Sequence, residues 1–224
     1  MCTEYTPENT GVDDMSRFCL QALCAACCLF FVSCSSTSEN LGGDEIRIEK
    51  SAGGYFAVRS LGLKFRTPDG WFAMNQNQLD FLSRVGTELF VGDDATKQAA
   101  AEVAQSKILL SFSKYELGAP VTFNPITAIL LEDIRLFPGV KTGDVYLRNA
   151  GMLMSADSAA AVSEEITEVE NFDGLFEMKV VRDKVHQTYY ATVRDGYAIG
   201  IIETHGFSEN YADFPPLGDY IVLE

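Results

Sequence analysis

The sequence predicts an α+β protein: an α-β-α sandwich with a mainly antiparallel central sheet, preceded by a signal helix and a flexible tether. Apolar residues make up 47% of the 224 residues, enough for a sizeable core. Short β-rich runs follow one another after residue 162 and are separated by Asp-Gly turns. Helical patterns lie at both ends of the strand-rich region, which is typical of a layered α+β fold. We expect a single folded domain over residues 55–224.

The cysteines are confined to the N-terminal segment. A disulfide framework or a zinc site would need ligands spread through the folded part. The pair Cys24-x-x-Cys27 has no second pair and no histidine nearby. We therefore interpret the cysteines before residue 34 as small apolar residues of a hydrophobic segment, and we predict no metal and no cofactor. All six lie in the first 34 residues: Cys2, Cys19, Cys24, Cys27, Cys28 and Cys34.

Residues 15–33 have the layout of a bacterial signal peptide. Arg17 supplies the basic start, and residues 18–33 form a mostly apolar run of 16 residues. As a helix this run would rise about 24 Å, less than the roughly 30 Å core of a bilayer, which disfavours the alternative of a transmembrane span. An uncleaved or conventionally cleaved signal is the other alternative. Residues 1–14 include acidic residues that oppose export, so we expect the true start to be Met15.

The end of the apolar run, Phe31-Val32-Ser33-Cys34, resembles the lipobox of bacterial lipoproteins. Phe31 departs from the usual aliphatic residue at its position, whereas the other three fit. The resemblance implies signal cleavage between Ser33 and Cys34, and a diacylglycerol on Cys34 that anchors the chain to the membrane. Ser35 follows the cysteine, which in Gram-negative lipoproteins implies the outer membrane, with the domain facing the periplasm.

Residues 34–54 are predicted to be the lipidated cysteine and its tether. The stretch is rich in Ser, Gly and charged residues. Twenty flexible residues span about 25 Å root-mean-square, enough to hold a domain off a membrane. Ile46 and Ile48 alternate with charged residues and could instead form a short edge strand.

The first part of the domain reads as strands and helices joined by Gly and Pro turns. Trp71 follows a Pro-Asp-Gly turn and is predicted to pack in the core. Asp94 can cap an Ala-rich helix that runs to about Ser106. The expected strands are 55–59, 63–65, 107–115 and 126–136, with a break at Gly62 and a helix over 76–85.

A further helix is predicted to begin at Thr142 or Gly143. Its residues Leu147, Ala150, Gly151 and Met154 fall at spacings of three and four, which builds one buried face.

The remaining residues are predicted to form an antiparallel meander. Asp173-Gly174 and Asp195-Gly196 are strong hairpin signals. Residues 197–202 are nearly all apolar, as expected of a central strand that is covered on both faces. The tail is predicted to be a short helix, interrupted by proline, that packs Phe214, Leu217, Ile221 and Leu223 on the sheet. The expected strands are 166–170, 175–182, 187–194 and 197–203.

Two stretches resemble the Mog1/PsbP/DcrB-like superfamily. They are "LKFRTPDGWF" near the start of the domain, and "NPITAILLEDI" followed by the closing "HQTYYATVRDGYAIGIIETHGFSENYADFPPLGDYIVLE". The resemblance covers about residues 55–224. It implies an α-β-α sandwich that acts as a binding or assembly subunit, often periplasmic or lipid-anchored and usually without catalysis. It transfers no functional residue to this chain.

The sequence carries few groups for catalysis. It has no P-loop, no nucleotide-binding glycine fingerprint, no Gly-x-Ser-x-Gly and no His-Glu-x-x-His motif. His186 begins a strand and is expected at a surface or an edge. His205 ends a strand two residues after Glu203, so the pair could form a ligand site or provide a general base; capping or packing is the alternative. Glu132 and Asp133 lie late in a strand and could point into a groove.

The net charge of the chain disfavours some classes of binding partner. The formal net charge of −15 disfavours nucleic acid and anionic lipid as electrostatic partners. We therefore expect a non-enzymatic envelope protein, held at the membrane by covalent lipid, that binds or assembles a protein partner. The alternatives are a lipoprotein that binds a small molecule or ion, and a hydrolase that uses His205 with nearby carboxylates.

Overall fold

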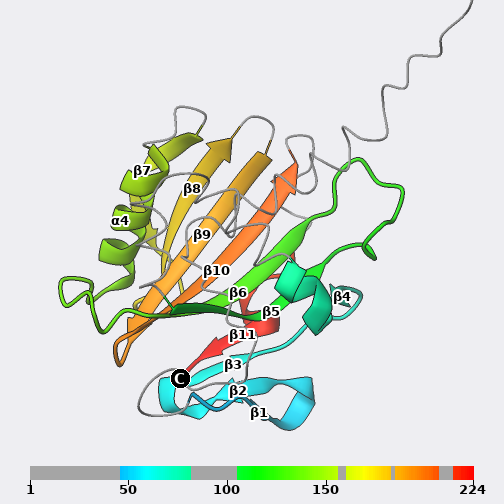
Figure 1. Ribbon diagram of the computed structural model, residues 1–224, viewed down its shortest axis with the longest axis horizontal. Helices are drawn as coiled ribbons and strands as arrows, with labels where there is room; N and C mark the ends of the chain where they lie inside the picture. The colour runs from blue at the N-terminus through cyan, green and yellow to red at the C-terminus, as the bar shows by residue number, and fades with distance from the viewer. Residues whose placement is uncertain (1–45, 82–104, 156–159, 183–184, 207–213) are drawn as a thin grey trace, which may run out of the picture.

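The computed structural model describes residues 46–81, 105–155, 160–182, 185–206 and 214–224 of the chain. They form two sheets in which all paired strands are antiparallel (Figure 1). The large sheet has the order β4-β5-β6-β10-β9-β8-β7. Its strands are β4 (Phe72–Ala73), β5 (Gln105–Ser113), β6 (Ile126–Asp133), β7 (Ala160–Glu168), β8 (Phe176–Arg182), β9 (Val185–Arg194) and β10 (Tyr197–Gly206).

The small sheet has the order β1-β2-β3-β11 and joins both ends of the described chain. Its strands are β1 (Glu49–Lys50), β2 (Phe56–Val58), β3 (Leu63–Phe65) and β11 (Ile221–Leu223). The helices are α4 (Gly143–Ser155), α5 (Leu217–Tyr220), η1 (Ala52–Gly54) and η2 (Arg59–Leu61), and residues 76–81 are also helical.

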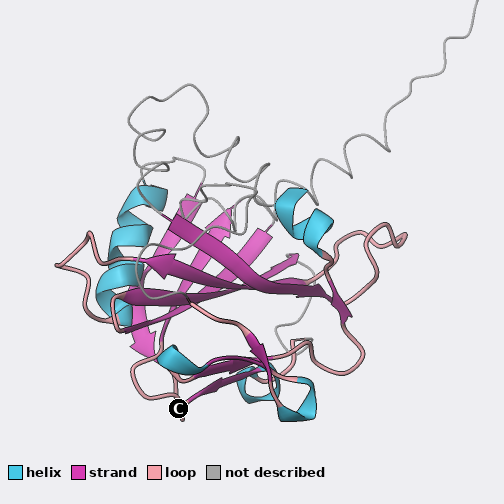
Figure 2. Ribbon diagram, turned by 60° about the horizontal axis from the view of Figure 1, so that its bottom comes forward, coloured by secondary structure: helices cyan, strands magenta, loops and turns pink. Residues whose placement is uncertain are grey.

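The large sheet lies between two different layers. Helix α4 packs on β7, β8 and β9 on one face. On the other face the small sheet stacks on the large one (Figure 2). Alternate residues of β10 therefore enter two separate cores, because successive side chains of a strand point to opposite faces.

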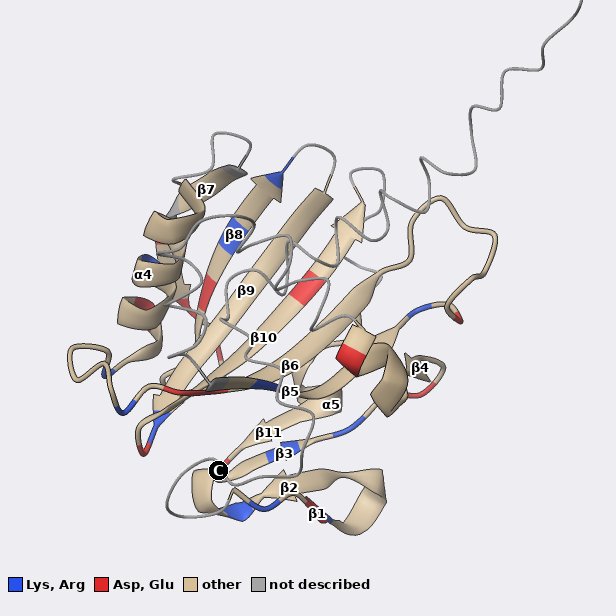
Figure 3. Ribbon diagram, in the orientation of Figure 1, with Lys and Arg blue, Asp and Glu red and all other residues tan. Residues whose placement is uncertain are grey.

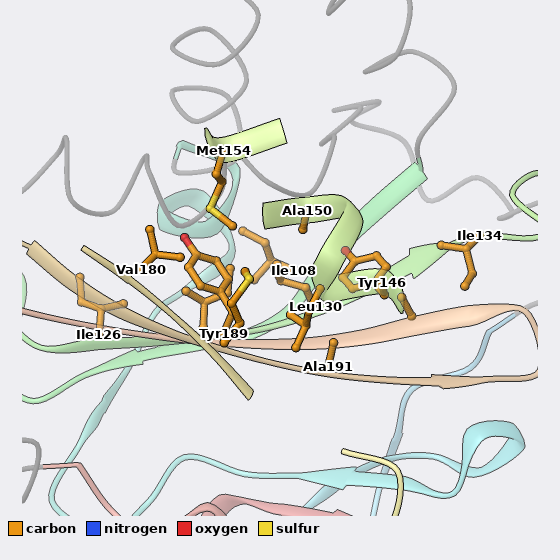
Figure 4. Close-up of a cluster of buried hydrophobic side chains, with 14 of the residues drawn as sticks. Ile108, Ile126, Leu130, Ile134, Tyr146, Ala150, Met154, Val180, Tyr189 and Ala191 are labelled. Atoms are coloured by element: carbon orange, nitrogen blue, oxygen red, sulfur yellow. The ribbon is translucent and has the colours of Figure 1, made fainter. Parts of the chain in front are cut away.

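The helix-side core packs α4 against residues of β5, β6, β8 and β9 (Figure 4). Strand β10 adds Ala198 and Ile202 to it. Leu147 of α4 is fully buried, and Tyr146, Ala150 and Met154 lie on the same face of the helix. The predicted spacing is therefore confirmed, since Leu147, Ala150, Gly151 and Met154 are all buried.

The sheet-side core fills the space between the two sheets. The large sheet contributes Phe112, Ile129, Ile199 and Ile201 to it, and the small sheet contributes Val58, Leu63, Phe65 and Ile221. Trp71 packs against this core, with its ring 5.5 Å from that of Phe112, as predicted for a core aromatic.

The meander follows from local turn chemistry. Asp195 and Gly196 both have positive φ, 48° and 80°, as a two-residue type I′ hairpin turn requires. All ten residues of β10 are buried, because the strand lies between β6 and β9 and is covered on both faces. The prediction of a central strand over 197–202 is confirmed.

Some predicted boundaries are wrong. Gln105 and Ser106 belong to β5, so the Ala-rich helix cannot run to Ser106, and the part of it before residue 105 lies outside the described residues. Strand β6 ends at Asp133 rather than Leu136. Backbone hydrogen bonds from Phe137 to Ile134 and from Val140 to Phe137 turn the chain there instead.

The largest correction concerns the tail. Residues Ile221–Leu223 were predicted to belong to a helix that packs on the sheet, but they form β11 and pair with β3. The helix that does form, α5, has four residues, and Tyr220 is its buried member.

The N-terminal side of the fold also starts earlier than residue 55. Glu49 and Lys50 pair with β2, and Ile46 packs against the sheet-side core. This corrects the prediction of a tether as far as residue 54. An edge strand does form, but at Glu49–Lys50, directly after the Ile46–Ile48 stretch for which the alternative predicted it.

The α+β class and the mainly antiparallel central sheet are confirmed. Of the two outer layers in the described part of the chain, one contains α4 and the other combines the short helix α5 with the small sheet.

Candidate functional site

The two residues singled out by sequence, Glu203 and His205, lie on the same face of β10. They are two positions apart, so both side chains point into the space between the two sheets. Both are buried, with 6% of Glu203 and 2% of His205 exposed. They are therefore close in space, as predicted, but they belong to the interior of the fold.

The carboxyl group of Glu203 accepts two hydrogen bonds from tyrosines. Tyr220 of α5 donates to Oε1 at 2.8 Å, and Tyr190 of β9 donates to Oε2 at 3.1 Å. In register, Glu203 lies opposite Thr127 of β6 and Thr188 of β9, and both threonines are buried. The carboxyl group thus links the central strand to the short helix of the other layer.

This environment favours the neutral form of Glu203. Burial raises its pKa to about 7, against the opposing hydrogen bonds from Tyr220 and Tyr190, and the charge of Glu177 adds to the rise. Burial and the nearby Glu203 also raise the pKa of Tyr220 well above its ordinary value, so this tyrosine stays a hydrogen-bond donor. The Glu203–Tyr220 contact is therefore a buried polar link between the layers.

His205 stacks on His186, the other histidine of the chain. Its ring lies 5.3 Å from that of His186, at an interplanar angle of 29°, and the two residues are register partners across β10 and β9. Its Nδ1 lies 3.3 Å from the carbonyl oxygen of Gly206, and the ring of Phe214 approaches edge-on at 5.9 Å. These contacts describe a packed imidazole.

The pKa of His205 is lowered. Burial is the main cause; the hydrogen bond with the Gly206 carbonyl opposes it, and the charge of His186 adds to the lowering. The prediction that His186 lies at a surface or an edge is wrong. The residue is half-buried on β9, an interior strand that pairs with both β8 and β10.

A second buried carboxyl lies on the opposite face of the sheet. Tyr146 of α4 donates a hydrogen bond of 2.6 Å to Oε2 of Glu132 on β6. Burial raises the pKa of Glu132 to about 7, with the hydrogen bond from Tyr146 acting in the opposite sense. Glu132 therefore faces α4 rather than an open groove. Its neighbour Asp133 is half-buried and pairs with Arg135 at 2.5 Å.

The hydrogen bonds from tyrosines to the two buried carboxyl groups were not predicted from the sequence. Tyr146 lies four residues before Ala150 on the predicted buried face of α4, and that position alone could have marked it as buried. Tyr190 and Tyr220 had no such signal, because their link to Glu203 joins strand β9 and helix α5 to strand β10.

The remaining predicted site residues, Ser33 and Cys34, lie outside the described residues. Within the described ranges, no group of three or more His, Cys, Asp and Glu side chains is placed to hold a metal ion. In the same ranges, no helix has both the length and the apolar character that crossing a bilayer requires.

Comparison with known proteins gives little further information. No protein-family model and no curated protein matches the chain. Among solved structures, it is similar to the solution structure of cyanobacterial PsbP (CyanoP) from Synechocystis sp. PCC 6803, with 14% sequence identity and a TM-score of 0.35. That match covers 76% of this chain and 86% of the other.

Proposed function

We propose that the chain is a non-enzymatic, lipid-anchored protein of a bacterial cell envelope, and that its domain binds a protein partner. The observation that carries the anchor is in the sequence. A 16-residue apolar run ends in Val32-Ser33-Cys34, and no cysteine follows Cys34 in the remaining 190 residues. A diacylglycerol on Cys34 would bury two acyl chains, enough for stable membrane binding.

The buried site supports a role without catalysis. A general base must reach a proton on the substrate, but the side chain of His205 is packed among His186, Phe214 and the backbone of Gly206. The two oxygens of Glu203 are engaged by Tyr220 and Tyr190. Both side chains are therefore occupied by contacts inside the fold.

Exposed apolar side chains support a protein partner. Phe72 on β4 is 48% exposed, and Tyr115 and Leu117, which follow β5, are 36% and 41% exposed. Phe72 is the register partner of Ser113 at the end of β5, so these residues lie at one end of the large sheet. We call this set the distal patch. Exposed apolar residues at one place on a surface are typical of protein contacts.

Incorporation of labelled fatty acid in cells tests the anchor. We expect label on the wild-type protein and none on the Cys34→Ser variant. Cys28→Ser is the matched control, because Cys28 lies within the apolar run and should not receive lipid. Equal incorporation of label by wild type and the Cys34→Ser variant would count against the anchor.

Site-specific cross-linking in intact envelopes tests the partner. A photoreactive phenylalanine analogue at Phe72 or Leu117 should give one reproducible adduct with a second protein. The same analogue at Lys179, an exposed residue of β8, is the control. Recovery of the uncross-linked chain alone at all three positions would contradict partner binding through the distal patch.

A further inference from the structure

We propose that one end of the domain rests on the membrane surface, with Leu136 and Phe137 inserted at the boundary between headgroups and acyl chains. This inference rests on the proposed lipid anchor at Cys34 and adds the orientation of the domain relative to the bilayer. The end in question, which we call the anchor-side end, comprises Ile46, η2, the β9–β10 turn and the loop of residues 134–140.

Strand pairing places the start of the described chain at this end. Strand β1 runs antiparallel to β2, with Glu49 opposite Ala57, so the chain before Glu49 runs alongside the end of β2 and toward η2. Arg59 of η2 donates a hydrogen bond of 2.7 Å to the carboxylate of Glu49. Ile46 therefore emerges beside η2.

The β9–β10 turn and the apolar loop lie at the same end. Arg194, just before the turn, donates to the carbonyl oxygen of Leu61 in η2 at 3.1 Å. The backbone N–H of Ile134 donates to the carbonyl oxygen of Gly196 in the turn at 2.9 Å. Figure 1 shows the β9–β10 turn, the segment between β6 and α4 and the C-terminus on one side of the molecule.

The loop of residues 134–140 exposes apolar side chains to solvent, while its backbone is held by hydrogen bonds and its two ends pack on the core. Leu136 is 72% exposed and Phe137 40% exposed. The backbone N–H of Phe137 donates to Ile134 at 2.8 Å, and that of Val140 donates to Phe137 at 2.9 Å. Ile134 is buried in the helix-side core and Val140 packs against it. Two consecutive turns therefore hold Leu136 and Phe137 outward, and insertion would require no rearrangement of the loop.

The length of chain before the fold ties this end to the anchor. Residues 35–45 separate Cys34 from Ile46. Fully extended, that stretch reaches about 40 Å, and as a flexible chain it spans about 19 Å root-mean-square. At the root-mean-square length, a lipid on Cys34 would hold Ile46 closer to the bilayer than the roughly 30 Å that separate the two ends of β5.

The charges at this end suit a neutral or zwitterionic surface. Arg59 pairs with Glu49, and Arg135 pairs with Asp133 while lying 5.2 Å from the ring centre of Tyr197. Figure 3 shows basic and acidic residues mixed around the β9–β10 turn. Because Arg59 and Arg135 are each paired with an acid, contact with the bilayer would come from apolar insertion rather than from attraction to anionic lipid.

The distal patch provides the comparison. Phe72 is also an exposed aromatic residue, but it lies at the other end of β5, where Ser113 is its partner. The nine residues of β5 separate the two ends by about 30 Å. Exposure alone therefore does not identify the residues that contact the membrane. The loop of residues 134–140 is proposed because it lies at the same end of the domain as Ile46.

Depth-dependent fluorescence quenching tests the inference. The full lipoprotein would carry Phe137→Cys, Leu136→Cys or, as the matched control, Phe72→Cys, each labelled with an environment-sensitive fluorophore. A lipid on the sulfur of Cys34 leaves the introduced thiol as the only site for the label. In phosphatidylcholine vesicles that contain a shallow spin-labelled lipid, we expect at least threefold stronger quenching at 137 and 136 than at 72.

The outcomes separate this inference from the proposed function. Mass spectrometry of the same preparation reports whether Cys34 carries lipid. Lipidated protein with equal quenching at 137, 136 and 72 would overturn the orientation and leave the anchor intact. Unmodified Cys34 would overturn both. Because Leu136 and Phe137 are exposed, their replacement should leave the circular dichroism spectrum unchanged. Labelling two positions separately ensures that a local defect at one of them does not decide the result.

Discussion

Tyr220 donates a hydrogen bond of 2.8 Å to Glu203, and this contact joins the C-terminal helix α5 to the central strand β10. Both side chains are buried between the two sheets. Strand β11 follows Tyr220 directly and pairs with β3, so the same contact also fixes the end of the chain that completes the small sheet. Polar and apolar contacts thus hold the two layers together at this position.

Tyr220→Phe should destabilise the fold. The variant keeps the ring but leaves Oε1 of Glu203 buried without this donor, which costs about 1–3 kcal/mol. Urea denaturation measures the change, and Tyr115→Phe, at an exposed tyrosine, is the control expected to stay within about 0.5 kcal/mol of wild type. Equal stability of the two variants would show that the hydroxyl of Tyr220 does not hold the layers together.

The pH dependence of stability should carry the signature of the two buried carboxyls. Glu203 and Glu132 have pKa values raised from an ordinary 4.5 to about 7. The folded state therefore binds more protons than the unfolded state in that window, so their contribution to the free energy of unfolding falls as pH rises from about 4.5 to 7. Each shift corresponds to about 3 kcal/mol.

Glu203→Gln isolates one of these contributions. His205 acts in the opposite sense, because its lowered pKa gives stability that is lost as pH falls below about 6.5. The difference between wild type and Glu203→Gln removes that background. Between pH 4.5 and 7, we expect the free energy of unfolding of the variant to rise by about 3 kcal/mol relative to that of wild type. For the control Glu116→Gln, at an exposed residue, the plot of unfolding free energy against pH should run parallel to that of wild type. A parallel plot for Glu203→Gln would contradict a neutral buried Glu203.

Gly143→Ala should destabilise the contact of α4 with the sheet. A Cβ atom at this position would lie 2.0 Å from the carbonyl oxygen of Ala191 on β9, so the helix start would have to move. The expected cost is about 1–3 kcal/mol by thermal denaturation. Gly139→Ala, where a Cβ would meet nothing within 4 Å, is the control and should leave stability within about 0.5 kcal/mol of wild type. Equal melting temperatures would mean that α4 can shift freely on β9.

Local patterns allowed the meander and α4 to be predicted from the sequence. The Asp195-Gly196 turn and the spacing of Leu147, Ala150 and Met154 depend on residues that are neighbours in the chain. The tail could not be read in this way. Ile221–Leu223 is a short apolar run, compatible with either helix or strand, and its pairing with β3 joins residues about 160 positions apart.

The candidate site shows the same limit. The alternation of β10 predicts that Glu203 and His205 share a face. Whether that face opens to solvent depends on α5 and β9, which bring Tyr220 and Tyr190 onto the carboxyl group. Burial of this kind is decided by packing between distant segments, which a single sequence does not record.

The N-terminal peptide of the mature protein tests the proposed anchor most directly. Mass spectrometry of protein from the membrane fraction should find a chain that begins at Cys34 and carries a diacylglyceryl group on its sulfur. A soluble, unmodified chain that still contains the Ser33–Cys34 bond would contradict lipid anchoring at Cys34.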